Sequence, residues 1–407
     1  MNRVVITGVG LCSALGNTPG ALFDALLAGR SAVRAFPEWQ SIAELQCLVG
    51  APLEGFDPKA IPRKHRRSMG KVAMLAVSAA VDAVAMAGLP EAALTGGRVG
   101  AAIGSTMGSN QAEEEFWRHF VENQTAHGLS ATHFLKVMSH TCATNVAMFF
   151  GLTGEAIATN AACASSNRAL GASLDRLRSG RADVMLAGGA DELHVAAALT
   201  FDVMGGGTRA FTATPTLTPR PFDARRDGIV VGEGAGVLVL ETRAHAEARG
   251  ATILGEVLGY GGASDAVNMA HPAADGMETS VRLALADAGL QASEIDYVNA
   301  HATGTPIGDA AEAEALHRIF GEHVPVSSIK GHLGHTLGAC GALEAIVCLE
   351  AMRRGIVPPT RNLEEPDVAP ILLPTAPLAH PVRHAVSTNF AFGGVNTAVV
   401  LGAPPAP

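Results

Sequence analysis

Short apolar strands alternate with helical segments along most of the chain. Residues 99–103, 182–187 and 229–241 are rich in β-branched or small apolar side chains and are predicted strands. They are apolar throughout rather than at every second position, so helices must cover both faces of their sheets. The pattern predicts an α/β protein in which functional side chains gather where strands end.

The composition narrows the class of protein. The chain has 407 residues, of which 48% are hydrophobic, enough for a large core in one big domain or two fused ones. Its net charge of −9 provides no overall basic field for nucleic acid or an anionic membrane. No uninterrupted apolar stretch reaches the roughly 18 residues of a membrane span. Because the six cysteines form no C-x-x-C pair and the N-terminus lacks a signal-peptide pattern, we expect a cytoplasmic protein.

Cys163 lies where a predicted strand passes into a predicted helix. Leu170, Leu174 and Leu177 recur after it at helical spacing, and Gly180 is expected to end the helix. The amides and the positive end of a helix favour a thiolate at such a turn, which makes Cys163 a candidate nucleophile. A small buried cysteine on a core helix fits the same run, so this stretch alone leaves both interpretations open.

Three more ionisable side chains follow predicted strands at turns rich in glycine or alanine. His301 follows one such strand, and Lys330 and His335 follow the strand predicted for 324–329. Side chains at strand ends in an α/β protein can converge with Cys163 on one pocket. His332 and His335 lack a third ligand at a metal-binding spacing, so no metal site is expected.

Local turn and capping patterns suggest three further features. Gly8 and Gly10 follow a short strand and predict a tight turn, although a dinucleotide fingerprint would need a third glycine where Ser13 stands. Asp309, with Glu312 three residues later, has the spacing of a capping box at the start of a helix. The segment Asn389 to Asn396 is expected to be a loop before the strand 397–401.

The densest basic segment of this acidic chain lies just before a predicted helix at 72–87. It contains Arg63, Lys64, Arg66 and Arg67. Local positive charge in a negative protein can steer an acidic partner. A solvated helix start accounts for the same residues, so both interpretations stay open at this point.

Five ordered motifs resemble those of the β-ketoacyl-acyl-carrier-protein synthases, the decarboxylative condensing enzymes of fatty acid and type II polyketide synthesis. They are NAACASS around Cys163, HATGTPIGD from His301, SSIKGHLGHTLGACGALEA from Ser327, PPTRNLEEPD at 358–367 and NFAFGGVN from Asn389, and the resemblance extends back to VVITGVG at 4–10. The resemblance implies a thiolase-like, five-layered αβαβα fold built from two similar halves. Residues 1–250 would carry the nucleophilic cysteine, and residues 251–407 the two histidines, the lysine and the gating loop.

The resemblance implies a role for each catalytic side chain. Cys163 would take a primer acyl group from an acyl carrier protein thioester. His301 and His335 would assist decarboxylation of a malonyl thioester, and Lys330, paired with Glu344, would hold a positive charge beside them. The carbanion would then attack the acyl-cysteine to give a 3-oxoacyl product. No bound cofactor is implied, because phosphopantetheine on the carrier protein holds the substrates.

The resemblance also implies supporting positions and partners. The backbone amides of Cys163 and Phe392 would form an oxyanion hole, with Asp309 and Glu312 in support. The implied substrate-binding positions are Thr303, Thr305, Met107 and Phe390. The implied docking residues for the acidic carrier protein are Arg63, Lys64, Arg66, Arg67 and Arg209. The chain would act as a homodimer or as a heterodimer with a related ketosynthase-like chain.

Departures from the family pattern leave alternatives open. Ala302 and Ala391 stand where glycines are usual, and Val395 replaces a common threonine, so the gating loop has less backbone freedom. A dedicated lipid, polyene or polyketide synthase is therefore weighed beside a general fatty-acid enzyme. A chain-length-setting partner subunit is disfavoured because Cys163 is retained. A thiolase or coenzyme A acyltransferase is disfavoured because the last motif has no thiol.

Overall fold

A ten-stranded sheet runs through the centre of the molecule. The computed structural model describes residues 2–269 and 271–405, and its strand order is β11-β10-β14-β15-β9-β1-β8-β6-β4-β5. The ten strands are β1 (Val4–Ser13), β4 (Val99–Gly104), β5 (Ala156–Ala158), β6 (Val184–Asp191), β8 (Gly234–Thr242), β9 (Gly255–Ser264), β10 (Tyr297–Asn299), β11 (Val326–Ser327), β14 (His384–Ala391) and β15 (Val395–Gly402).

The two halves of this sheet repeat one arrangement. The order β5-β4-β6-β8-β1 in one half matches β11-β10-β14-β15-β9 in the other. In each half, the strand next to the edge (β4 or β10) is parallel to both neighbours, and the other pairs are antiparallel. A short antiparallel pairing of β1 with β9 joins the halves. The two similar halves expected from the sequence are therefore present.

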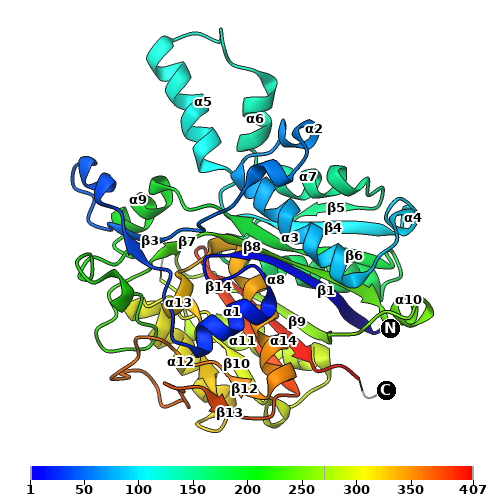
Figure 1. The fold of residues 1–407 in the computed structure, drawn as a ribbon. Helices are drawn as coiled ribbons and strands as arrows, with labels where there is room; N and C mark the ends of the chain where they lie inside the picture. The colour runs from blue at the N-terminus through cyan, green and yellow to red at the C-terminus, as the bar shows by residue number, and fades with distance from the viewer. Residues whose placement is uncertain (1, 270, 406–407) are drawn as a thin grey trace.

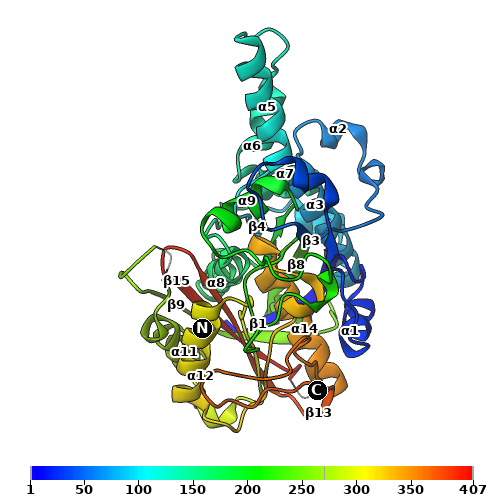
Figure 2. The same ribbon diagram turned by 90° about the vertical axis from the view of Figure 1, so that its left-hand side faces the viewer.

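The two halves of the sheet are two layers of the fold, and helices form the other three (Figures 1 and 2). The middle layer contains α8 (Ser165–Arg178) and α14 (Cys340–Arg354), which touch strands of both halves. The outer layers are α3 (Lys71–Ala87) with α7 (Thr141–Phe150), and α11 (Ala274–Ala288) with α12 (Pro306–Phe320). Separate apolar clusters fill the middle and the two outer interfaces. The αβαβα prediction is confirmed.

The expected glycine turn after residue 6 is wrong, because β1 continues through Gly8 and Gly10 to Ser13. Added Cβ atoms there would lie 2.2 Å from the carbonyl oxygen of Ala83 and 2.0 Å from that of Ala79, both on α3. Gly259 and Gly261 allow the same close approach of α11 to β9. These glycines thus serve strand–helix packing rather than a turn.

Two other local expectations need correction near the C-terminus. Residues 389–391 belong to β14, which pairs with β15 through a turn at 392–394, so the expected loop is a hairpin. Of the strand expected at 324–329, only Val326 and Ser327 form β11, and Pro325 makes a single bridge to Leu372. In both places, tertiary pairing rather than local composition sets the boundary.

Further elements lie outside the layers. The helices are α1 (Pro19–Leu27), α2 (Arg63–Arg66), α4 (Glu91–Leu94), α5 (Asn110–Asn123), α6 (Ala131–Val137), α9 (Val195–Val203), α10 (Arg243–Ala248) and α13 (Lys330–Leu333). The strands are β2 (Arg34–Ala35), β3 (Val49–Ala51), β7 (Val231–Gly232), β12 (Ile356–Val357) and β13 (Leu378–Ala379). Helices α5 and α6 project from the body as an arm at the top of both views (Figures 1 and 2). Among the described residues, no helix has the length and apolar character needed to cross a membrane.

Candidate active site

A cleft of about 300 Å³ contains Cys163, His301 and His335 together. These residues come from the loop before α8, the end of β10 and the segment after α13, and all three side chains are buried. Six other residues singled out from the sequence also line the cleft: Thr303, Thr305, Asp309, Glu312, Phe390 and Phe392. The topology thus brings Cys163 together with His301, which lies 138 positions later in the sequence.

A strained turn presents Cys163 at the start of α8. Ala162, just before it, has φ +46°, which is unusual for a residue with a Cβ atom. The Ser165 hydroxyl accepts a hydrogen bond from the amide of Ala161 at 2.9 Å and donates one to the carbonyl of Ala162 at 2.6 Å. This side chain fixes the turn that points the thiol into the cleft.

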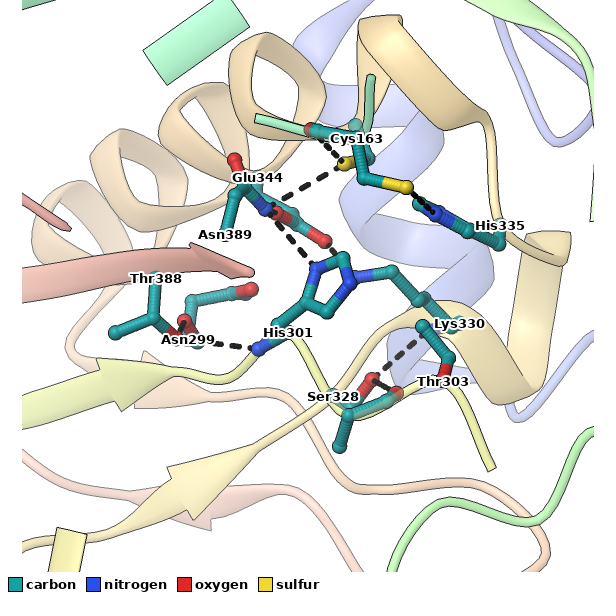
Figure 3. Close-up of polar contacts among 12 residues, drawn as sticks. Cys163, Asn299, His301, Thr303, Ser328, Lys330, His335, Glu344, Thr388 and Asn389 are labelled. Carbon is teal, nitrogen blue, oxygen red and sulfur yellow. Dashed lines mark hydrogen bonds and ion pairs between the residues drawn. The ribbon is translucent and has the colours of Figure 1, made fainter. Parts of the chain in front are cut away.

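His335 is the hydrogen-bond partner of the thiol. Its Nε2 lies 2.9 Å from Sγ of Cys163 (Figure 3). Burial raises the pKa of Cys163 to about 12, and the nearby charge of Lys330 opposes this rise. Burial, aided by Lys330, also lowers the pKa of His335 well below its usual value. The resting site therefore holds a neutral thiol beside a neutral imidazole, not the thiolate that the helix start led us to expect.

His301 faces His335 across the cleft. The two rings are nearly perpendicular, at 86°, with centroids 5.1 Å apart. Asn389 Nδ2 donates to Nδ1 of His301 at 3.4 Å. Burial and the charge of Lys330 lower the pKa of His301 well below its usual value, so the ring is neutral. Since Nδ1 accepts a hydrogen bond, the single ring proton is carried on Nε2.

Lys330 and Glu344 form a buried ion pair next to the histidines. Nζ of Lys330 lies 2.5 Å from Oε1 of Glu344, and Asn389 donates to Oε2 at 2.7 Å (Figure 3). Burial lowers the pKa of Lys330, but the Glu344 carboxylate outweighs this effect and leaves the pKa raised. The lysine is therefore charged, and Asn389 links the ion pair to His301.

The expected capping box at Asp309 and Glu312 is wrong. Helix α12 already begins at Pro306, because proline fits the first helical position, and Asp309 lies inside it. The Asp309 carboxylate instead accepts hydrogen bonds from the backbone amides of residues 303–305. Glu312 accepts from the amides of His301 and Ala302, at 2.8 and 2.6 Å. Burial raises the pKa of Asp309 to about 6 and that of Glu312 to about 7. These two carboxyls hold the histidine loop rather than cap a helix.

The remaining sequence candidates lie elsewhere. Met107 does not line the cleft and packs in a separate apolar cluster with Phe201 and Leu337. The basic residues of α2 and Arg67 lie at the surface, Arg66 being half-buried. Arg209 is exposed but bound to Asp202 at 2.9 Å. The roles in substrate binding and docking stay predictions.

Two residues that sequence reasoning missed belong to the polar network. Sγ of Cys340 donates a hydrogen bond to the backbone oxygen of Cys163 at 3.3 Å. Nδ2 of Asn389 lies 3.4 Å from Sγ of Cys340. Both residues stand within motifs that the sequence already marked, around His335 and in NFAFGGVN. A cysteine or an asparagine at these positions does not by itself indicate such hydrogen bonds, because the residues that they bond are distant in sequence.

One set of side chains could hold a metal ion. The ligating atoms of Cys163, His301 and His335 all lie within 4.8 Å of one another. Sequence spacing did not suggest this set, because its members come from three separate segments. The charged Lys330 ammonium beside them disfavours a cation. The absence of a metal therefore stays a prediction.

Comparison with known proteins shows the family of the chain. Residues 1–246 match the family model of the beta-ketoacyl synthase N-terminal domain, and residues 254–364 match that of the C-terminal domain. Nodulation protein E of Rhizobium meliloti (strain 1021) is 40% identical, and 3-oxoacyl-[acyl-carrier-protein] synthase 1 of Escherichia coli (strain K12) is 33% identical. The alignments cover 98% of this chain in both cases, with 98% and 99% of the relatives.

Solved structures share the whole fold. A beta-ketoacyl synthase from Burkholderia phymatum is 44% identical with a TM-score of 0.96, and the match covers 100% of both chains. The ishigamide ketosynthase/chain length factor is 33% identical with a TM-score of 0.92, over 99% of this chain and 100% of that one. The chain therefore belongs to the β-ketoacyl synthase family of condensing enzymes.

Proposed function

We propose that the protein joins an acyl group on Cys163 to a malonyl unit carried by acyl carrier protein, with loss of CO₂, to give a 3-oxoacyl thioester. The observation that carries this proposal is the contact between Sγ of Cys163 and Nε2 of His335, with His301 facing both. A thiol is both a good nucleophile and, as thiolate, a good leaving group, so the acyl-enzyme can form and then be broken.

The acylation step uses the thiol and its neighbour. As Sγ of Cys163 attacks the primer thioester, its proton passes to Nε2 of His335, which is neutral and able to accept it. The same proton then leaves with the carrier thiol, so His335 returns to its neutral state. The backbone amides of Cys163 and Phe392 would stabilise the oxyanion.

Condensation uses both imidazoles. The N–H group at Nε2 of His301, and that of His335 once its ring proton has moved to Nε2, would donate to the thioester oxygen of the malonyl unit, where negative charge develops as CO₂ leaves. The resulting carbanion attacks the acyl-Cys163 carbonyl, and Cys163 leaves as a thiolate. The charged Lys330 lies close enough to favour these anionic species. No bound cofactor is needed in this scheme.

The same proposal includes two partners. Acyl carrier protein would deliver both substrates, in keeping with the name of the Escherichia coli relative. A second copy, or a related chain as in the ishigamide ketosynthase/chain length factor, would pair with the projecting arm. That arm exposes Trp117, Phe120, Val121 and Phe134, which favours a protein contact.

All six cysteines are free thiols, which fits the reducing cytoplasm.

The test is intact-protein mass spectrometry after incubation with acyl carrier protein thioesters of several chain lengths. A single acyl adduct is expected on the native chain and none on Cys163→Ala, while Cys142→Ala, a buried thiol on α7, should still be acylated. Absence of any adduct with every donor would contradict a self-sufficient synthase. It would favour the alternative of a chain-length-setting partner subunit.

A further inference from the structure

A buried carboxylate, Asp191 at the end of β6, joins two segments near the cleft. Oδ1 accepts a hydrogen bond from the Ser105 hydroxyl at 2.7 Å. Oδ2 accepts from the backbone amides of Thr106 at 2.9 Å and Gly338 at 2.6 Å. The side chain is 2% exposed, so it makes these bonds in place of contacts with water.

The first joined segment follows directly on His335. It contains Leu337, whose φ of +51° is unfavourable for a residue with a Cβ atom. A Cβ added to Gly338 would lie 2.7 Å from Oδ2 of Asp191, so only glycine fits there. The Ser166 hydroxyl, three residues after Cys163, donates to the Gly338 carbonyl. The strained turn that carries His335 is thus tied to Asp191 and to the nucleophile's helix.

The second joined segment is the loop that carries Met107. Its side chain packs with Leu337 and Phe201 in one apolar cluster. The Phe201 ring in turn lies 5.8 Å from that of Phe392, which lines the cleft. The Met107 loop is therefore connected to the His335 turn both by apolar contact and through Asp191.

We propose that Asp191 is a positioning residue that sets the His335 turn against Cys163. The proposal does not rest on the proposed function, because any reagent that attacks the Cys163 thiol tests the position of His335.

The experiment compares Asp191→Ala, Asp191→Asn and Glu192→Ala. An asparagine can accept both amides with its oxygen and donate its NH₂ to the Ser105 hydroxyl, so it should restore what alanine loses. Glu192 is the matched control: it is equally buried and bonds the far end of the same loop, at Ser109 and Gln111, but not the His335 turn.

Two rates are measured at a temperature at which circular dichroism shows that each variant is folded. The first is alkylation of Cys163 by iodoacetamide as a function of pH, and the second is acylation by carrier-protein thioesters. For Asp191→Ala we expect both rates to fall at least about tenfold. Asp191→Asn and Glu192→Ala should stay within about threefold of the native chain.

Several outcomes overturn the proposal. Native rates in folded Asp191→Ala would do so, as would equal losses in Asp191→Ala and Glu192→Ala. If Asp191→Ala does not fold, Met107→Ala tests the same connection from its other end. We expect it to slow alkylation of Cys163, and a native alkylation rate would contradict the connection. If the native chain accepts no thioester, the proposed function fails while the alkylation result still decides the role of Asp191.

Discussion

Sγ of Cys163 lies 2.9 Å from Nε2 of His335. The ring of His301, in contrast, contacts the ring of His335 edge to face, with the two planes nearly perpendicular. The two histidines are therefore not equivalent. His335 can take and return the thiol proton, and His301 presents Nε2 to the cleft while Asn389 occupies its other nitrogen. This difference separates acylation from decarboxylation.

Replacing His301 with alanine should leave acylation largely intact. The acyl adduct on Cys163 should form within about threefold of the native rate, because the thiol keeps its contact with His335. Release of CO₂ from malonyl carrier protein should fall about a hundredfold or more, since one donor to the developing oxyanion is gone. His335→Ala should slow both steps. Adduct formation followed by mass, beside ¹⁴CO₂ release, distinguishes the two, and equal losses of acylation would contradict the assignment.

The reactivity of Cys163 should depend steeply on pH. Because burial raises the pKa of the thiol to about 12, the thiolate is a small fraction at neutral pH. Alkylation by iodoacetamide should rise about tenfold per pH unit from about pH 7 to about pH 10, without a plateau. Peptide mapping of the labelled thiol checks this, with Cys163→Ala as the blank. A plateau below about pH 8 would mean that the resting site holds a thiolate.

Removing one partner of the buried ion pair should destabilise the fold. Lys330→Met leaves the carboxylate of Glu344 buried and unpaired, which costs about 3–5 kcal/mol. Arg353→Met is the control, because it breaks an exposed ion pair on α14, the helix that also carries Glu344. The Arg353 side chain is 63% exposed, so loss of its ion pair with Glu350 should cost less than about 1 kcal/mol. Urea unfolding followed by circular dichroism gives both values. Similar midpoints for the two variants would contradict this ranking.

The paired glycines of the two halves should be equally intolerant of side chains. Gly10→Ala and Gly261→Ala each place a Cβ about 2.0 Å from a helix carbonyl, of Ala79 and Ser280 respectively. Each should lower stability by about 3 kcal/mol or more, or prevent folding, because strand and helix must separate. Gly20→Ala on α1, where an added Cβ would lie 3.4 Å from Nη2 of Arg354 in ordinary van der Waals contact, should be neutral or stabilising. Thermal melts and yields of folded protein provide the measurement.

Charge reversal on α2 should weaken carrier-protein delivery without changing the chemistry. In Arg63→Glu with Lys64→Glu, we expect KM for acyl carrier protein to rise about fivefold or more, mostly at low salt, with kcat unchanged. Arg383→Glu, an exposed charge before β14, is the control. If small pantetheine thioesters show the same loss as the carrier protein, the defect lies in the site and not in docking.

Sequence patterns located the side chains that meet in the cleft because each lies in a short motif at the end of an element. Cys163, His301 and His335 were singled out by their position after strands, and the alternation of apolar strands with helices predicted the layered fold. Such features depend on neighbours within a few residues, so one chain read in order reveals them.

Local sequence patterns gave wrong predictions where contacts with distant segments determine the structure. Asp309 and Glu312 have capping-box spacing, yet they bond the loop around His301, because an earlier proline starts the helix. Gly8 and Gly10 resemble a turn, yet a helix about 70 residues later lies against them. The same holds for the thiol, whose neutral state follows from burial by the rest of the fold rather than from the helix start.

The amino-acid sequence by itself thus determined the fold class, the family and the candidate side chains that line the cleft. Only the tertiary structure decided which nitrogen meets the thiol, that Asp191 ties the His335 turn to the Met107 loop, and that Glu344 raises the pKa of the buried Lys330. The physical reason is that hydrogen bonds and desolvation act through space, over atoms that the chain brings together from positions more than a hundred residues apart.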